Sequence, residues 1–377
     1  MASRVPSASV VNVLTLILIG FAPNVGVPRP LSAQQPATID SSCRSTFDSM
    51  VADVSRNYPG YQEKVRGHRA AFAALSDSVR ERARAATDWG TQCFPALRHW
   101  VEFFKDPHIA GPWQAAPPSP QPQASGAQAI QPPDSSQLPS LVTLDTSTLL
   151  LRLPDLDVTL KPTIDSLVAA HWDALRNTRY LIVDVRGDGG GCTCSYDTLM
   201  SLVIAGPVRS DGKDVLASPA NEAYWRDWLT QGVLGASEEI LIRKAIQRMQ
   251  SHEGQLVQLF PAQVLRPKSV SRLPQRVAVL VDRKCASSCE DFVLAARQSS
   301  KVTIMGSENT EGVHDYGNIR KVYLPGWRQM RVPTTRTRGP RIDLMGIKPD
   351  VLLPLGTDLV VSASHFLKSG KRNQAPQ

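Results

Sequence analysis

Ser287 is the leading candidate for a reactive side chain in this sequence. It follows a continuous apolar stretch through a turn of small residues, and Glu290 and Asp291 come where the first turn of a helix is expected. A serine at the start of a helix lies near free backbone N–H groups, which can stabilise a developing oxyanion. The same position suits a serine that only caps the helix, and local sequence alone favours the cap.

A glycine turn at the end of another apolar strand is the second such feature. Gly189, Gly190 and Gly191 expose backbone N–H groups and allow a ligand or a neighbouring loop to approach closely. The turn lacks the register of the phosphate motifs G-x-x-x-x-G-K and G-x-G-x-x-G, so it does not indicate nucleotide binding. Taken by itself, it could equally be a tight turn.

The elements that must position these two turns predict an α/β core. Strands are expected over 148–153, 180–185, 277–282 and 302–305, and helices over 162–176, 198–204 and 291–298. Strands that alternate with helices are typical of a sheet covered by helices.

Composition divides the rest of the chain. We expect a signal peptide over 1–33, a helical unit over 40–110, a Pro-rich linker over 111–140, the α/β core over 141–356 with a helical insertion at about 220–260, and a C-terminal tail over 357–377. Arg4 and the apolar residues within 10–21 are typical of a secretory signal, and that apolar run is too short to span a bilayer. A secreted or periplasmic protein with no membrane span after signal removal is therefore predicted.

Charge and cysteine content narrow the classes of function. The formal net charge is +8, but the basic residues form no run or stripe, which argues against nucleic-acid binding. The six cysteines (43, 93, 192, 194, 285 and 289) favour disulfides in an exported protein, although sequence alone does not choose among the pairings. Their C-x-C and C-x3-C spacings fit a structural zinc site poorly.

Three segments occur in an order that one family shares. They are LIVDVRGDGGG (181–191), VLVDRKCASSCE (279–290) and GIKPD (346–350). They resemble the "D-x-R-x-N-x-G-G", "V-L-V-D-x-x-T-A-S-A-x-E" and "G-I-x-P-D" segments of the C-terminal-processing, or tail-specific, serine peptidases and their tricorn relatives. The resemblance covers roughly residues 140–356. It implies a ClpP/crotonase-like layered core with an N-terminal helical bundle, a protein or peptide substrate, and no metal or cofactor.

The resemblance also implies roles for single residues. Ser287 is the nucleophile, and the backbone N–H groups of Ser288 and Gly190 form the oxyanion hole. Asp188 stands where the family has Asn, and Cys285 stands where it has Thr.

The expected general base depends on the branch of the family. Tail-specific members use a lysine in a segment like G-x-x-T-x-G-K-G, and here Val313 stands at that position. The tricorn-like branch takes a histidine from the N-terminal part, in a segment that 106–109 resembles. The resemblance therefore implies His108 as the base, with His314 as an alternative.

An acidic group is expected to orient the imidazole. Asp343 matches the family's acidic position best, with Glu311 and Asp106 as competitors. If the two catalytic loops meet, disulfides between the 192/194 pair and the 285/289 pair would rigidify them, and Cys43 with Cys93 would staple the helical unit.

The alternative function is a catalytically inactive ligand- or peptide-binding protein on the same fold. The departures at Asp188, Cys285 and Val313 are compatible with a decayed site. An active peptidase requires His108 within hydrogen-bond reach of Ser287, whereas an inactive binding protein does not. A CoA-dependent enzyme of the crotonase type lacks support, because no basic cluster accompanies the glycine turn.

Overall fold

The computed structural model describes residues 42–111, 138–232, 234–266 and 270–369. The expected signal peptide, almost all of the expected linker and the end of the expected tail lie outside these residues. Among the described residues, none of the helices combines the length and the apolar character that a membrane crossing requires.

Six strands form the main sheet, in the order β1-β2-β3-β8-β9-β12. Their bounds are β1 Ser140–Asp145, β2 Thr148–Arg152, β3 Tyr180–Asp184, β8 Arg276–Val281, β9 Val302–Gly306 and β12 Val351–Leu352. β1 runs antiparallel to β2, and the other neighbours are parallel. β3 is buried along its whole length because both faces of the sheet are covered, as its unbroken apolar sequence requires.

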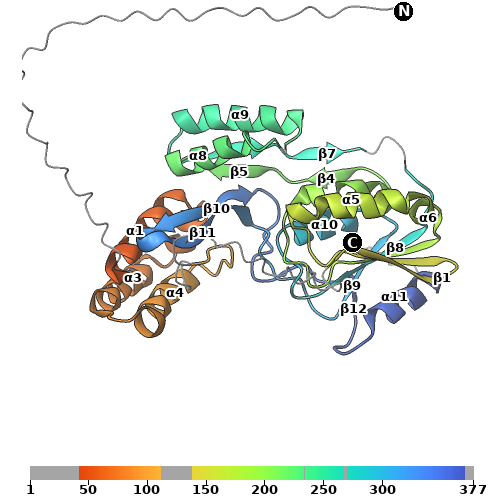
Figure 1. Ribbon diagram of the computed structural model, residues 1–377, viewed down its shortest axis with the longest axis horizontal. Coiled ribbons are helices and arrows are strands. Elements are labelled where there is room, and N and C mark those ends of the chain that lie inside the picture. Colours follow the sequence, from red (N-terminus) through yellow and green to blue (C-terminus); the bar gives the residue numbers. More distant parts are fainter. Residues whose placement is uncertain (1–41, 112–137, 233, 267–269, 370–377) are drawn as a thin grey trace, which may run out of the picture. The chain divides into compact units, whose positions relative to one another are not determined.

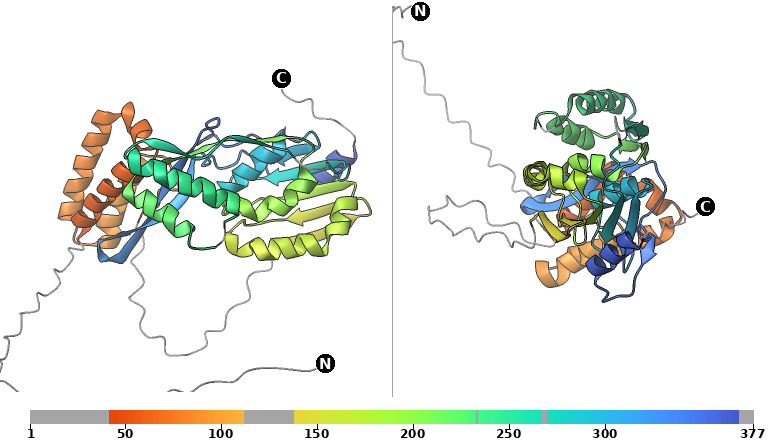
Figure 2. Two further views of the ribbon diagram at one scale, coloured as in Figure 1. Left: turned by 90° about the horizontal axis from the view of Figure 1, so that it is seen from above. Right: turned by 90° about the vertical axis from the view of Figure 1, so that its right-hand side faces the viewer.

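Helices cover both faces of this sheet (Figures 1 and 2). The first face packs against α5 Lys161–Ala170, α6 Trp172–Asn177, α7 Asp197–Val203 and α10 Ser288–Arg297, with the short helices η3 Val158–Leu160 and η4 Thr193–Tyr196 alongside. Leu181 and Val183 point to this face, whereas Tyr180 and Ile182 point to the other, where α11 Leu359–Lys368 packs. This alternation is the period of two of a strand. The layered α/β fold predicted from the sequence is confirmed.

α11 lies in the segment expected as a C-terminal tail. Leu359, Ala363 and Leu367 recur every four residues, so they form one apolar stripe of the helix. All three are buried against the main sheet. The segment 359–368 is therefore part of the core packing.

The N-terminal residues form helices that share a second core with a distant hairpin. The helices are α1 Cys43–Asn57, α2 Tyr61–Arg66, α3 Arg69–Ala85, η1 Trp89–Cys93 and α4 Phe94–Glu102. Their apolar stripes pack against β10 Tyr316–Leu324 and β11 Arg328–Thr337, which are joined by η5 Pro325–Trp327. In Figure 1 this hairpin, drawn in blue, lies beside α1.

The same hairpin continues into a four-stranded antiparallel sheet, in the order β10-β11-β5-β6. β5 Lys213–Leu216 and β6 Leu256–Phe260 are covered by α8 Pro219–Trp228 and α9 Ala236–Ser251, which occupy the segment expected as a helical insertion. β4 Val208–Ser210 and β7 Gln263–Leu265 form a separate pair.

Candidate active site

Ser287 lies in a strained turn between β8 and α10. Its backbone has φ 54° and ψ −113°, a conformation that residues with a Cβ rarely adopt. Such a residue costs on the order of 1–3 kcal/mol and persists only where its surroundings impose it, most often at functional sites. A serine on a sharp strand-to-helix turn is also the arrangement that presents a nucleophile in serine hydrolases.

The glycine turn lies directly against this serine. A Cβ added to Gly190, whose φ is 98°, would lie 2.7 Å from Ala286 O and 2.9 Å from Ser287 Cβ, so only glycine fits there. Ala286 N–H donates to Asp188 O at 3.1 Å, and Ser288 Oγ–H donates to Gly191 O at 2.9 Å. The two turns, about a hundred residues apart in the sequence, form one structure.

The two expected oxyanion donors differ in their availability. Ser288 is the first residue of α10, so its N–H has no acceptor within the helix. The Gly190 N–H instead donates to Asp188 Oδ1 at 2.8 Å. The carboxylate that replaces the family's Asn therefore engages one of the two donors.

The cysteines pair within each turn. Cys43–Cys93 forms as expected, but the other disulfides are Cys192–Cys194 and Cys285–Cys289. The expectation of bridges between the two catalytic turns is wrong. The turns meet through Gly190 and Ser288, while each of these two disulfides joins cysteines that are two or four residues apart in one segment.

His108 is buried just after α4, in the turn that Asp106 and Pro107 form. Only 8% of the residue is exposed, and Nδ1 lies 3.5 Å from Asp106 Oδ1. Among the described residues this Nδ1 has no hydrogen-bond partner. Asp106 is fixed by two donors, the His108 N–H at 2.9 Å and the Tyr58 O–H at 2.8 Å. Asp106 is thus the carboxylate beside the imidazole.

Asp343, the expected orienting acid, has a different partner. Its Oδ2 lies 2.9 Å from Lys64 Nζ, and within the described ranges no hydrogen bond or ion pair joins it to His108. Burial raises the pKa of Asp343 to about 6, although Lys64 lowers it. Sequence could not reveal this pair, because Lys64 lies 279 residues away.

His314, the alternative base, is held by another carboxylate. Its Nε2 lies 2.8 Å from Asp291 Oδ1, and Lys213 Nζ lies 3.2 Å from Asp291 Oδ2. Burial opposes ionisation of Asp291, but Lys213 and His314 outweigh it and hold the pKa of that carboxyl below its usual value. His314 and Lys213 therefore both contact Asp291 of α10, one through each carboxylate oxygen.

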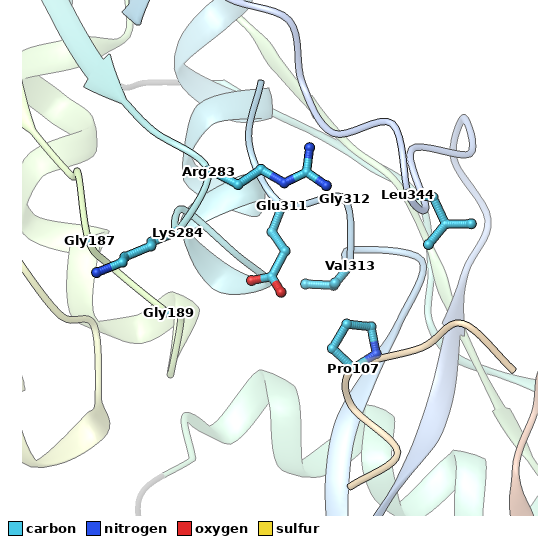
Figure 3. Close-up of a pocket in the computed structure, with 9 residues that line it drawn as sticks. All are labelled: Pro107, Gly187, Gly189, Arg283, Lys284, Glu311, Gly312, Val313 and Leu344. Atoms are coloured by element: carbon cyan, nitrogen blue, oxygen red, sulfur yellow. The ribbon is translucent and has the colours of Figure 1, made fainter. Parts of the chain in front are cut away.

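A cavity of about 530 Å³ adjoins the two turns (Figure 3). Its lining residues are Pro107, Gly187, Gly189, Arg283, Lys284, Glu311, Gly312, Val313 and Leu344. Pro107 precedes His108 along the chain, Gly189 belongs to the glycine turn, and Lys284 lies three residues before Ser287. In Figure 3 the Glu311 carboxyl extends toward Pro107 and Val313. Burial raises the pKa of Glu311, as does Glu290, while the nearby His108 and Arg283 lower it.

Glu290 organises the site, a role that the sequence did not predict. Although 0% exposed, it accepts four hydrogen bonds, which come from Ser287 N–H (3.3 Å), Val313 N–H (2.9 Å), Gly312 N–H (2.8 Å) and the Thr310 hydroxyl (2.5 Å). It therefore ties the wall of the cavity to the serine turn. The only sequence signal was its place three residues after Ser287, which is typical of a capping box.

A strained serine against a glycine turn, on an α/β fold and beside a cavity, defines the site of a serine hydrolase. Residues 147–353, more than half of the chain, match Peptidase family S41. The chain belongs to this family, and it is a serine-type peptidase. The recognition made from the three sequence segments is confirmed.

Solved structures share the fold. Mature CPAF matches with a TM-score of 0.59 at 12% identity, over 86% of this chain and 96% of that chain. CPAF complexed with lactacystin matches with a TM-score of 0.57 at 13% identity, over 87% and 97%. A lipoprotein from Streptococcus agalactiae matches with a TM-score of 0.50 at 12% identity, over 90% and 99%. No curated protein matches the chain.

Proposed function

We propose that the protein is an exported endopeptidase that cleaves peptide bonds through an acyl-enzyme on Ser287, with His108 as general base. The observation that carries the proposal is the strained backbone of Ser287 against Gly190. A helix cap needs no such strain, since serine caps ordinarily have extended backbone angles. The family supplies the reaction class, and the composition of residues 1–33 supplies the expectation of export.

In the proposed mechanism His108 takes the proton of the Ser287 hydroxyl as Oγ attacks the substrate carbonyl carbon. The tetrahedral intermediate collapses, the C–N bond breaks, and His108 gives its proton to the leaving amine. Water then attacks the ester with the same base, releasing the new carboxylic acid and restoring Ser287. The Ser288 N–H and one N–H of the glycine turn, that of Gly190, stabilise the oxyanion.

Asp106 is proposed as the group that orients His108, in place of Asp343. Its Oδ1 lies 3.5 Å from His108 Nδ1, which has no hydrogen-bond partner among the residues that the structure describes, and a small movement on substrate binding would bring the two atoms into hydrogen-bond distance. Asp343 is already paired with Lys64.

A fluorophosphonate probe tests the proposal, because it phosphonylates an activated serine with loss of fluoride. We expect the wild-type protein to be labelled and Ser287→Ala to remain unlabelled. Ser201→Ala is the matched control, since this exposed serine of α7 belongs to neither turn and its hydroxyl donates to Thr198 O at 3.3 Å, and it should keep its label. A folded wild-type protein that takes no label would favour a peptide- or ligand-binding protein on the same fold.

A second pair of variants tests the base. His108→Gln should lower the labelling rate by about 100-fold or more, as the loss of a general base does. His314→Gln should reduce it far less, because that imidazole is held by Asp291. The opposite order would assign the base to His314. Fractionation of cells that produce the full chain tests export.

A further inference from the structure

Asp188 is a buried carboxyl that bridges the two turns of the site. Its side chain is fully buried, and Oδ1 accepts the Gly190 N–H at 2.8 Å and the Leu156 N–H at 3.2 Å. Its own backbone carbonyl accepts the Ala286 N–H, one residue before Ser287. Oδ2 is buried without a hydrogen-bond partner in the part of the chain that the structure describes. A buried carboxylate oxygen that accepts no hydrogen bond is costly when charged.

We propose that Asp188 is a positioning residue whose ionised form withholds the Gly190 N–H from the oxyanion and whose neutral form releases it. The inference deepens the proposed function and rests on it. The geometry places a negative charge one hydrogen bond from an expected oxyanion donor and, through Gly190, against Ser287.

Two effects of the charge act in the same direction. A hydrogen bond to a carboxylate is roughly twice as strong as one to a neutral acceptor, so ionised Asp188 holds the Gly190 N–H more tightly. The same charge also repels the negative charge that develops on the substrate oxygen, and this repulsion is strong in a buried site. Loss of the charge should therefore speed attack by Ser287.

The ionisation of Asp188 falls near neutral pH. Burial raises the pKa of this carboxyl to about 7, against the effect of the Gly190 and Leu156 N–H groups, which lower it. Asp155, before η3, and Asp282, after β8, are the charged groups that act on it, and both raise its pKa further. Activity that depends on neutral Asp188 should therefore decline as the pH rises through this range.

The experiment measures the second-order rate of fluorophosphonate labelling from pH 5.5 to 9. Asp188→Asn keeps an oxygen for the Gly190 and Leu156 N–H groups, removes the charge and restores the residue that the related peptidases carry. We expect the ratio of variant to wild-type rate to be near one at the acidic end and to rise to roughly tenfold above pH 8, the equivalent of one pKa unit of differential interaction. Because the result is a ratio, pH effects that the variant and the wild type share cancel.

Asp155→Asn provides a second test of the inference, in which Asp188 itself is unchanged. Removing this neighbouring charge should lower the pKa of Asp188, so the alkaline decline of the labelling rate should move to lower pH. Asp173→Asn is the matched control, because Asp173 is 82% exposed and pairs only with Arg176 on α6. Its profile should follow that of the wild type.

The outcomes separate the inference from the proposed function. A ratio that stays flat with pH, or an Asp155→Asn profile identical to the wild type, would give Asp188 a purely structural role and overturn the inference. Labelling that is absent in the wild type, or that survives Ser287→Ala, would instead overturn the assignment of the nucleophile.

Discussion

Three carboxylates were candidates for orienting His108, and their contacts give them different capacities to do so. Asp106 lies beside the imidazole and is itself held by Tyr58, while Asp343 is neutralised by Lys64. Glu311 extends into the cavity and interacts with His108 only through its charge. A carboxylate orients a catalytic histidine best when it is fixed and close to the proton-bearing nitrogen.

Replacing Asp106 should therefore affect the reaction more than replacing Asp343. We expect Asp106→Asn to lower the labelling rate by about 100-fold, the usual scale of acid–base contributions. Asp343→Asn should lower it far less, because that carboxylate is paired with Lys64. Asp77→Asn is the control, because Asp77 is 75% exposed on α3 and pairs with Arg80, so its loss should leave the labelling rate unchanged. A larger loss in Asp343→Asn would restore that residue as the orienting acid.

Asp188 should also make the stability of the protein depend on pH. Its folded-state pKa, about 7, lies above the ordinary value of 3.8, so the folded state binds a proton that the unfolded state has lost. This contribution is fully present below pH 3.8 and is lost as the pH rises through 7, with a slope of at most about 1.4 kcal/mol per pH unit. The free energy of unfolding of Asp188→Asn should accordingly exceed that of the wild type by more at pH 7 than at pH 4. Urea denaturation at the two pH values measures the difference, and an equal difference at both would contradict it.

At the scale of elements, the wall of the cavity is held to α10 by Glu290. The segment 310–313 forms neither helix nor strand, and three of its polar groups donate to this one carboxylate. A fourth hydrogen bond, from Ser287 N–H, joins the proposed nucleophile to the same carboxylate. The helix start, the serine turn and the cavity wall therefore depend on one another.

Glu290→Gln should destabilise the protein and loosen the site. The amide has one acceptor oxygen in place of two, so buried N–H groups would lose charge-assisted hydrogen bonds at about 1.5–3 kcal/mol each. We expect a loss of about 3 kcal/mol in chemical denaturation together with slower labelling. Glu308→Gln is the matched control, since that exposed side chain accepts only the Arg283 N–H, at 3.3 Å. A Glu290→Gln protein as stable as this control would show that the hydrogen bonds to Glu290 contribute little to the free energy of unfolding.

At the scale of the whole molecule, the sequence predicted those features that depend on residues close together along the chain. The sheet strands are uninterrupted apolar runs, and the motifs around Gly190 and Ser287 occur in family order, so the fold class and the family followed from them. The pairing of Lys64 with Asp343 and the hydrogen bonds from residues 310–313 to Glu290 did not. These contacts join side chains of segments brought together only by folding, and neither residue type nor spacing encodes them.

The core shared by the N-terminal helices and the β10–β11 hairpin is another such contact. Apolar side chains from α1, α3 and α4 pack with Val322, Met330 and Val332 of the hairpin. Two residues after His108, Ala110 exchanges backbone hydrogen bonds with Arg331 at 3.2 and 2.7 Å. The segment that carries the proposed base is thus held by a strand that lies more than 200 residues later in the sequence.

Met330→Ala should therefore weaken both the fold and the site. Met330 is 0% exposed in this shared core, and truncating a buried methionine costs about 2–5 kcal/mol. We expect one cooperative unfolding transition at a lower midpoint, because the helices and the hairpin have no separate cores, and labelling of Ser287 should disappear in that same transition. Met345→Ala is the control, since Met345 is 62% exposed and should change the free energy of unfolding by less than about 0.5 kcal/mol. If the N-terminal helices of Met330→Ala melted in a first step while labelling persisted, His108 could not be the base, because the imidazole would leave the site with the helices.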